Sequence, residues 1–220
     1  MNADQILSRA NLDSLGCDGF IPFNGDYKDY SGNTNDGANN GSTFEHGING
    51  KEFVHFDGSN DYVSFGNNFQ VGTGDGTWFG WFKIPSIQDI TLMHKRYDFG
   101  SPVRWAFFLR VKSDGHLECL FRDETLYQLG DVGVSDINET DTWYNWCVTR
   151  VGTTAYMYLN GVQVDNVSVG TANFSTSSVN FEIGRQGTMY GNSDQANFMF
   201  FNTGISVGNI RKLYNATYIE

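Results

Sequence analysis

The most constraining feature of this sequence is a succession of short apolar runs that are separated by Gly, Asn, Asp and Ser. The clearest pair comprises residues 155–159 and 162–165, which are joined by Asn160-Gly161. Because Asn-Gly tolerates the positive φ angles of a two-residue type I′ turn, this segment predicts a β-hairpin. Short strands joined by tight turns are therefore expected to dominate the fold.

Further runs of strand length, rich in aromatic and β-branched residues, recur from about residue 19 onward. They cover residues 52–56, 61–65, 77–84, 104–112, 116–122, 143–150, 181–184 and 197–201. Ser113-Asp114-Gly115 predicts a second hairpin turn between two of these runs. Strands at a spacing of roughly 8–12 residues, with turn residues between them, indicate an antiparallel sandwich or barrel.

The organisation of the chain is that of one domain. Residues 143–150 carry large side chains at both odd and even positions, which is typical of a strand inside a two-layer sandwich. Helical patterns occur only at residues 3–12 and 205–214. No internal repeat or linker is visible, so we expect residues 1–18 to form an arm with a short helix and residues 19–220 to form a single domain.

The charge balance disfavours two classes of partner. The chain has 14 Lys and Arg residues against 25 Asp and Glu residues, a net charge of −11. Nucleic acid and anionic membrane surfaces are therefore not expected as partners, because both would repel this chain. No signal peptide is visible, and no apolar stretch approaches the ~18 residues that cross a bilayer. Cys17, Cys119 and Cys147 are odd in number and widely spaced, which predicts reduced thiols and synthesis in the cytoplasm.

Five segments resemble the motifs of one family. They are FNGD (residues 23–26), DYSGNTNDG (29–37), FDGSNDYV (56–63), WYNWCVTR (143–150) and YLNGV (158–162). In this order they are similar to the LamG-like, concanavalin A-like lectin/glucanase jelly rolls. The resemblance covers about residues 19–215 and implies an all-β fold: an antiparallel two-sheet jelly-roll β-sandwich with short N-terminal and C-terminal helices.

The family that this chain resembles also contains enzymes. Its retaining glucanases carry the motif E-[IVL]-D-x-x-E on one strand, which brings two carboxylates to one groove, and the sequence has no such motif. Glu118 and Asp123 would face opposite sides of a strand. Polysaccharide lyases of this fold need Tyr, His and Arg together on the concave sheet, whereas the four His residues are scattered. We therefore expect no enzyme, with a glycoside hydrolase or a polysaccharide lyase as the alternative.

A structural calcium ion is the one cofactor that the resemblance suggests. In family members such an ion often joins the first strand to the last, which implies Asp26 and Asp29 together with Asp194 as ligands. Calcium prefers oxygen ligands from flexible loops, and the loop around Asp26 and Asp29 is rich in them. The alternative is that these Asp residues are present because they stabilise Asx-turns.

Sugar binding by a jelly roll needs exposed aromatic rings beside side chains that hydrogen-bond to hydroxyl groups. The candidate carbohydrate-binding residues are Tyr97, Trp105, Tyr127, Tyr190, Arg96 and Arg185. Tyr97 and Tyr190, which are expected on loops, are favoured over Trp105 on a strand. The alternative is that these rings belong to the core, as we expect for four of the five Trp residues.

The resemblance and the missing catalytic motifs together predict a non-catalytic, lectin-like module that binds carbohydrate or another surface polymer. Lectin-like jelly rolls recur on virus particles, whose proteins are made in the cytoplasm without a signal peptide, so an accessory protein of a virus particle is the expected setting. Its partners there would be a glycan, capsid or tail proteins, or further copies of the chain. The alternative is a purely structural phage capsid decoration or fibre protein that binds no glycan.

Overall fold

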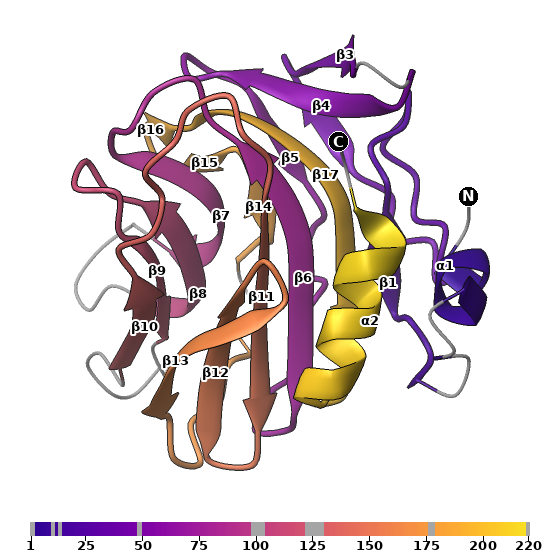
Figure 1. The fold of residues 1–220 in the computed structure, drawn as a ribbon, viewed down its shortest axis with the longest axis vertical. Coiled ribbons are helices and arrows are strands. Elements are labelled where there is room, and N and C mark those ends of the chain that lie inside the picture. The colour runs from indigo at the N-terminus through magenta and orange to yellow at the C-terminus, as the bar shows by residue number, and fades with distance from the viewer. Residues whose placement is uncertain are drawn as a thin grey trace.

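The computed structural model of the 220-residue chain describes residues 3–9, 12, 15–47, 50–97, 104–121, 130–175 and 179–218. Two antiparallel sheets pack face to face, and a helix lies along the outer side of one of them (Figure 1). The described elements are α1 (Ala3–Arg9), β1 (Gly19–Ile21), β2 (Ala38–Asn40), β3 (Thr43–His46), β4 (Glu52–Asp57), β5 (Tyr62–Ser64), β6 (Gly76–Lys83), β7 (Ile90–Tyr97), β8 (Arg104–Val111), β9 (Leu117–Phe121), β10 (Gly130–Val134), β11 (Tyr144–Val151), β12 (Thr154–Leu159), β13 (Val162–Ser168), β14 (Glu182–Ile183), β15 (Arg185–Gln186), β16 (Met189–Tyr190), β17 (Asn192–Phe201) and α2 (Val207–Thr217).

The two sheets are built from strands that are far apart in the sequence. Sheet A has the order β13-β12-β11-β6-β17-β4-β3, and β1 pairs with β17 beyond the end of β4. Sheet B has the order β10-β9-β8-β7-β14-β5-β2, and β15 and β16 form a separate hairpin. All of the strand pairs are antiparallel, so the predicted two-sheet sandwich with a short helix near each end is confirmed.

The predicted hairpin at Asn160-Gly161 is also confirmed. Leu159 of β12 pairs with Val162 of β13 across the turn. Asn160 and Gly161 have φ angles of 50° and 74°, the left-handed values that a type I′ turn requires. This turn is fixed by its own two residues, independently of the rest of the fold.

Aromatic side chains fill the space between the two sheets. Trp78 is buried there, its ring centroid 4.8 Å from that of Phe107 and 5.7 Å from that of Phe200. Its indole N–H donates a hydrogen bond of 3.0 Å to the carbonyl oxygen of Phe69, so the polar atom of this side chain is satisfied within the core.

A second core lies on the outer face of sheet A, under the two helices (Figure 1). Ile6 and Leu7 of α1 and Ile210 of α2 are buried in it. Trp81 of β6 stacks on Tyr214 of α2, with ring centroids 5.4 Å apart. Ile6, Leu7 and Leu12 of the expected arm therefore pack in the same cluster as the outer side chains of sheet A.

This second core explains the pattern of β11. Trp146 faces the core between the sheets, whereas Cys147 faces the core under the helices. The large side chains on both faces of this strand were expected inside a two-layer sandwich. The structure instead covers one face with a sheet and the other with a helix.

None of the described helices is long and apolar enough to span a membrane.

Candidate functional site

The outer face of sheet B carries polar side chains from β5, β14 and β7. Val63, Ile183 and Met93 are in register across these strands and belong to the core between the sheets. Successive side chains of a strand point to opposite faces, so Glu182 and His94 face away from that core. These two residues are also in register with each other.

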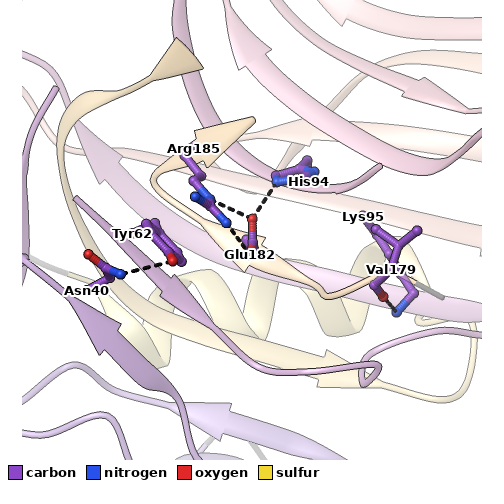
Figure 2. Close-up of polar contacts among 7 residues, drawn as sticks. All are labelled: Asn40, Tyr62, His94, Lys95, Val179, Glu182 and Arg185. Atoms are coloured by element: carbon purple, nitrogen blue, oxygen red, sulfur yellow. Dashed lines mark hydrogen bonds and ion pairs between the residues drawn. The ribbon is translucent and has the colours of Figure 1, made fainter. Parts of the chain in front are cut away.

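The carboxylate of Glu182 contacts two other side chains on this face, those of His94 and Arg185. Its Oε2 lies 3.0 Å from Nε2 of His94, and Arg185 donates hydrogen bonds of 2.8 Å and 2.9 Å to its two carboxylate oxygens (Figure 2). Burial raises the pKa of Glu182, but the hydrogen bonds and charges of His94 and Arg185 outweigh burial and lower it to about 2. A paired carboxylate therefore holds Arg185 in one orientation.

Arg185 in turn stacks on an aromatic ring. The guanidinium carbon lies 3.4 Å from the ring centroid of Tyr62, and Asn40 donates a hydrogen bond of 2.9 Å to the Tyr62 hydroxyl (Figure 2). The hydrogen bond to Glu182 raises the pKa of Arg185, and a further hydrogen bond joins Arg185 to Tyr190. Asn40 is exposed, and Tyr62, Arg185 and Tyr190 are partly exposed, so solvent reaches this cluster. We call Asn40, Tyr62, Glu182, Arg185 and Tyr190 the sheet B site.

Gly184 allows the chain to turn from β14 into the hairpin that carries Arg185. It has a φ of 91°, and its N–H donates to the carbonyl oxygen of Leu92. A Cβ atom at this position would lie 2.5 Å from the ring of Phe56. Glycine is required here for both reasons, because it alone combines this backbone conformation with so close an approach.

Lys95 lies beside the sheet B site but faces the interior. It is 1% exposed, and its ammonium donates to the side chain of Asn67 at 2.7 Å and to the carbonyl oxygen of Asn68 at 3.3 Å. It also donates to the carbonyl oxygen of Val179 at 3.0 Å, and Figure 2 shows Lys95 and Val179. Burial lowers the pKa of Lys95 to about 8. This ammonium ties β7 to two loops.

Residues 57–205 match the family model of the concanavalin A-like lectin/glucanases superfamily, known as Laminin_G_3, which covers more than half of the chain. The chain belongs to this superfamily. No curated protein sequence matches it.

Solved structures of similar fold include toxin binding domains. The binding domain of Paraclostridial Mosquitocidal Protein 1 has a TM-score of 0.72 and 15% identity, over 90% of this chain and 52% of that one. The ligand binding domain of botulinum neurotoxin serotype D, solved in complex with N-acetylneuraminic acid, has a TM-score of 0.70 and 14% identity, over 96% and 52%. The binding domain of botulinum neurotoxin DC, in complex with SialylT, has a TM-score of 0.65 and 14% identity, over 87% and 48%. The chain thus spans about half the length of these structures, and the likeness is one of fold.

Two of the predicted carbohydrate-binding residues belong to the sheet B site of this superfamily member, namely Arg185 and Tyr190. The expectation that Tyr97 and Tyr190 lie on loops is wrong, because they are the last residues of β7 and β16. Arg96 of β7 is in register with Trp105 of β8, but the structure describes only the backbone of Arg96, Tyr97 and Trp105. Tyr127 lies outside the described residues. The prediction for these four side chains therefore remains a prediction.

Sequence reasoning missed the other members of the sheet B site. Tyr62 lies within the FDGSNDYV segment, where it was treated only as part of a family motif. Glu182 follows Phe181 in a predicted strand, and alternation alone could have placed it on the outer face. No local signal identifies Asn40, because β2 has three exposed residues and no apolar alternation.

The structure separates the three predicted calcium ligands into two groups. Asp29 accepts hydrogen bonds from the backbone N–H groups of Phe20 at 2.9 Å, Ser31 at 2.9 Å and Asn35 at 3.0 Å. Burial raises its pKa, but these hydrogen bonds outweigh burial and lower it. Asp26 likewise accepts from a neighbouring backbone N–H, at 3.1 Å, and from the hydroxyl of Tyr30 at 2.9 Å.

Asp194 lies elsewhere, beside His55 and Glu45. Among the described residues, these three form the one group of His, Cys, Asp or Glu side chains whose ligand atoms all lie within 4.8 Å of one another. Asp26 and Asp29 do not belong to it. The backbone hydrogen bonds of Asp26 and Asp29 agree with the Asx-turn alternative, and calcium binding stays a prediction.

Proposed function

We propose that this chain is a non-catalytic module that binds a carbohydrate at the sheet B site. The observation that carries the proposal is that Arg185 stacks on the ring of Tyr62 and is fixed there by two hydrogen bonds to Glu182. Sugar-binding surfaces combine an aromatic ring with a few fixed polar groups that select among hydroxyl positions. Here Asn40 and Tyr190 supply polar atoms at the rim of the ring.

The side chains of the sheet B site are held in fixed orientations, and this supports a role in ligand binding. The ion pair between Glu182 and Arg185 is largely buried: the side chain of Glu182 is 8% exposed and that of Arg185 is 24% exposed. A group that is already held in its bound orientation loses little conformational entropy when a ligand binds. The complexes of similar domains with N-acetylneuraminic acid and SialylT also support a glycan as the ligand class.

The proposal predicts that Tyr62→Ala weakens glycan binding by at least about tenfold, since the ring contacts both the ligand and Arg185. A glycan array that includes sialylated oligosaccharides would identify the strongest ligand, and titration calorimetry would then compare the variant with the wild type. Tyr30→Ala is the matched control, because Tyr30 is another tyrosine that solvent reaches and whose hydroxyl is hydrogen-bonded to a neighbour, but it lies on the loop after β1. Binding that is equal in Tyr62→Ala and the wild type would contradict the proposal.

A polysaccharide lyase is the second candidate, because the sheet B face brings a Tyr, a His and an Arg together. Tyr62, His94 and Arg185 all contact this cluster. His94 is 3% exposed, however, and is bonded to the buried carboxylate of Glu182, so its imidazole is not presented to a substrate. This arrangement supports a binding role.

Incubation of the chain with anionic polysaccharides is therefore expected to release no unsaturated product, as followed by its ultraviolet absorbance. Product formation that is lost in Tyr62→Phe would replace the binding proposal with the lyase. Product formation that persists in Tyr62→Phe and copurifies with the chain would also contradict the absence of catalysis.

A place on a virus particle is a narrower form of the same proposal. Its support is that Cys17, Cys119 and Cys147 are free thiols, which fits folding in a reducing compartment. Capsid or tail genes beside the gene for this chain would support the particle setting, and genes for carbohydrate utilisation would contradict it.

A further inference from the structure

A second polar cluster lies on the outer face of sheet A, away from the sheet B site. Asp194 of β17 is in register with His55 of β4 on one side and with Lys83 of β6 on the other. Val54 and Phe56, the neighbours of His55, belong to the core between the sheets, so His55 faces outward. Three adjacent strands thus bring an imidazole, a carboxylate and an ammonium to one patch.

Glu45 of β3 completes the cluster. Nδ1 of His55 lies 2.7 Å from Oδ1 of Asp194 and 3.9 Å from Oε1 of Glu45. The other oxygen of Asp194, Oδ2, accepts a hydrogen bond of 2.9 Å from Lys83. One nitrogen and two carboxylate groups therefore converge, while Lys83 fixes the orientation of Asp194 from the opposite side.

The convergent atoms open into a pocket of about 310 Å³. Its wall includes the carboxylates of Glu45, Asp141 and Asp194 but only one ammonium, that of Lys83. With His55 neutral, the formal charge of this wall is three negative charges against one positive charge, or −2. Such a wall attracts a dication, and the pocket has room for the water molecules that complete its coordination.

We propose that His55, Glu45 and Asp194 bind a divalent transition-metal ion of the zinc class. Imidazole nitrogen favours zinc and its first-row neighbours over calcium and magnesium, which prefer oxygen ligands alone. Zinc binds nitrogen and carboxylate oxygen at about 2.0–2.2 Å, so two of its ligand atoms stand roughly 3 Å apart. The separations of 2.7 Å and 3.9 Å bracket this value, and the side chain of Glu45, 53% exposed, can rotate to adjust.

A plain ion pair between His55 and Asp194 is the competing reading. Lys83 already neutralises Asp194 at 2.9 Å, so a charged His55 is not needed for that purpose. Glu45, on the other side of His55, has no such ammonium partner among the contacts of the cluster in the described residues. A charged His55 would pair closely with Asp194, at 2.7 Å, but only loosely with Glu45, at 3.9 Å, whereas a metal ion would draw all three groups to bonding distance.

The test is titration of zinc sulfate into the full chain after treatment with a chelator, followed by calorimetry and by equilibrium dialysis. One zinc ion is expected per chain. His55→Gln and Glu45→Gln are each expected to weaken binding by at least about tenfold, because loss even of outer-shell partners costs 10–100-fold. Cobalt provides a second readout, since its visible absorption spectrum changes when an imidazole nitrogen coordinates it.

The matched control is His46→Gln. His46 lies on β3, next to Glu45 in the sequence and 3.6 Å from a carboxylate oxygen of Glu52, but it is 72% exposed and belongs to no group of three ligand side chains among the described residues. Zinc binding that is unchanged in His46→Gln and weakened in His55→Gln supports the site. No zinc binding by the wild type, or binding that is equal in His55→Gln and the wild type, would overturn it. Calcium binding that depends on His55 as strongly as zinc binding would also overturn the assignment of the metal class.

Discussion

Replacing Arg150 with Met is expected to lower the free energy of unfolding by about 3–5 kcal/mol, because the carbonyl oxygens that bind its buried guanidinium would lose their hydrogen-bond donor. Arg150 is 1% exposed. Its guanidinium donates to the carbonyl oxygens of Ala172 at 2.7 Å, Gly170 at 3.1 Å and Gly72 at 3.3 Å, and to that of Gly152 at 3.1 Å. It thus joins the loop before β6 to the loop after β13 at one end of the sandwich.

Methionine keeps most of the volume of the side chain but has no donor. The carbonyl groups would then have to be hydrated, which opens both loops, or remain unsatisfied. The contact of the guanidinium with the ring of Phe174, at 4.7 Å from the ring centroid, would be lost as well.

Urea denaturation of the wild type and Arg150→Met would measure this loss. Arg211→Met is the matched control, because Arg211 is exposed on α2 and its replacement is expected to change stability by less than about 0.5 kcal/mol. If Arg150→Met were as stable as Arg211→Met, the four hydrogen bonds would have no net role in stability.

Lys95→Met is expected to remove a dependence of stability on alkaline pH. Burial lowers the pKa of Lys95 from 10.5 to about 8 in the folded chain. Between these two pH values the unfolded chain keeps a proton on Lys95 that the folded chain has released. The free energy of unfolding of the wild type therefore rises with pH across this window, relative to that of Lys95→Met, by up to about 3 kcal/mol.

The measurement is urea denaturation of both proteins at several pH values from 7 to 10.5. Other groups that titrate in this range are common to both, so they cancel in the difference. Below pH 8 both states hold the proton on Lys95, and the difference is expected to be constant there. Lys212→Met, which removes an exposed ammonium from α2, controls for the loss of a charge without burial. A difference that stays flat up to pH 10.5 would mean that water reaches the Lys95 ammonium.

The strands could be predicted where their own side chains specify them. Residues 77–84 and 143–150 are long and strongly apolar, and they correspond closely to β6 and β11. By contrast, β7 was missed because His94, Lys95 and Arg96 read as a polar segment. The ammonium of Lys95 is buried only because Asn67, Asn68 and Val179 surround it, and these residues come from distant parts of the chain.

The predicted calcium ligands illustrate the same limit. Asp194 was grouped with Asp26 and Asp29 on the expectation that an ion joins the first strand to the last. In the structure β1 does pair with β17, but through residues 198–200. Asp194 lies in the part of β17 that pairs with β4, where it meets His55, 139 residues away in the sequence.

The fold class of this chain and its turns could be read from the residues alone, because turn residues and alternation act over a few neighbouring positions. Which polar side chains meet depends on the packing of distant strands. Asn40, Tyr62 and Glu182 come from β2, β5 and β14 and are brought together by the order and register of sheet B, and Arg185 reaches them from the separate β15–β16 hairpin that follows β14. That register is set by how the whole apolar core packs, and a shift of one residue would turn the first three of these side chains to the opposite face.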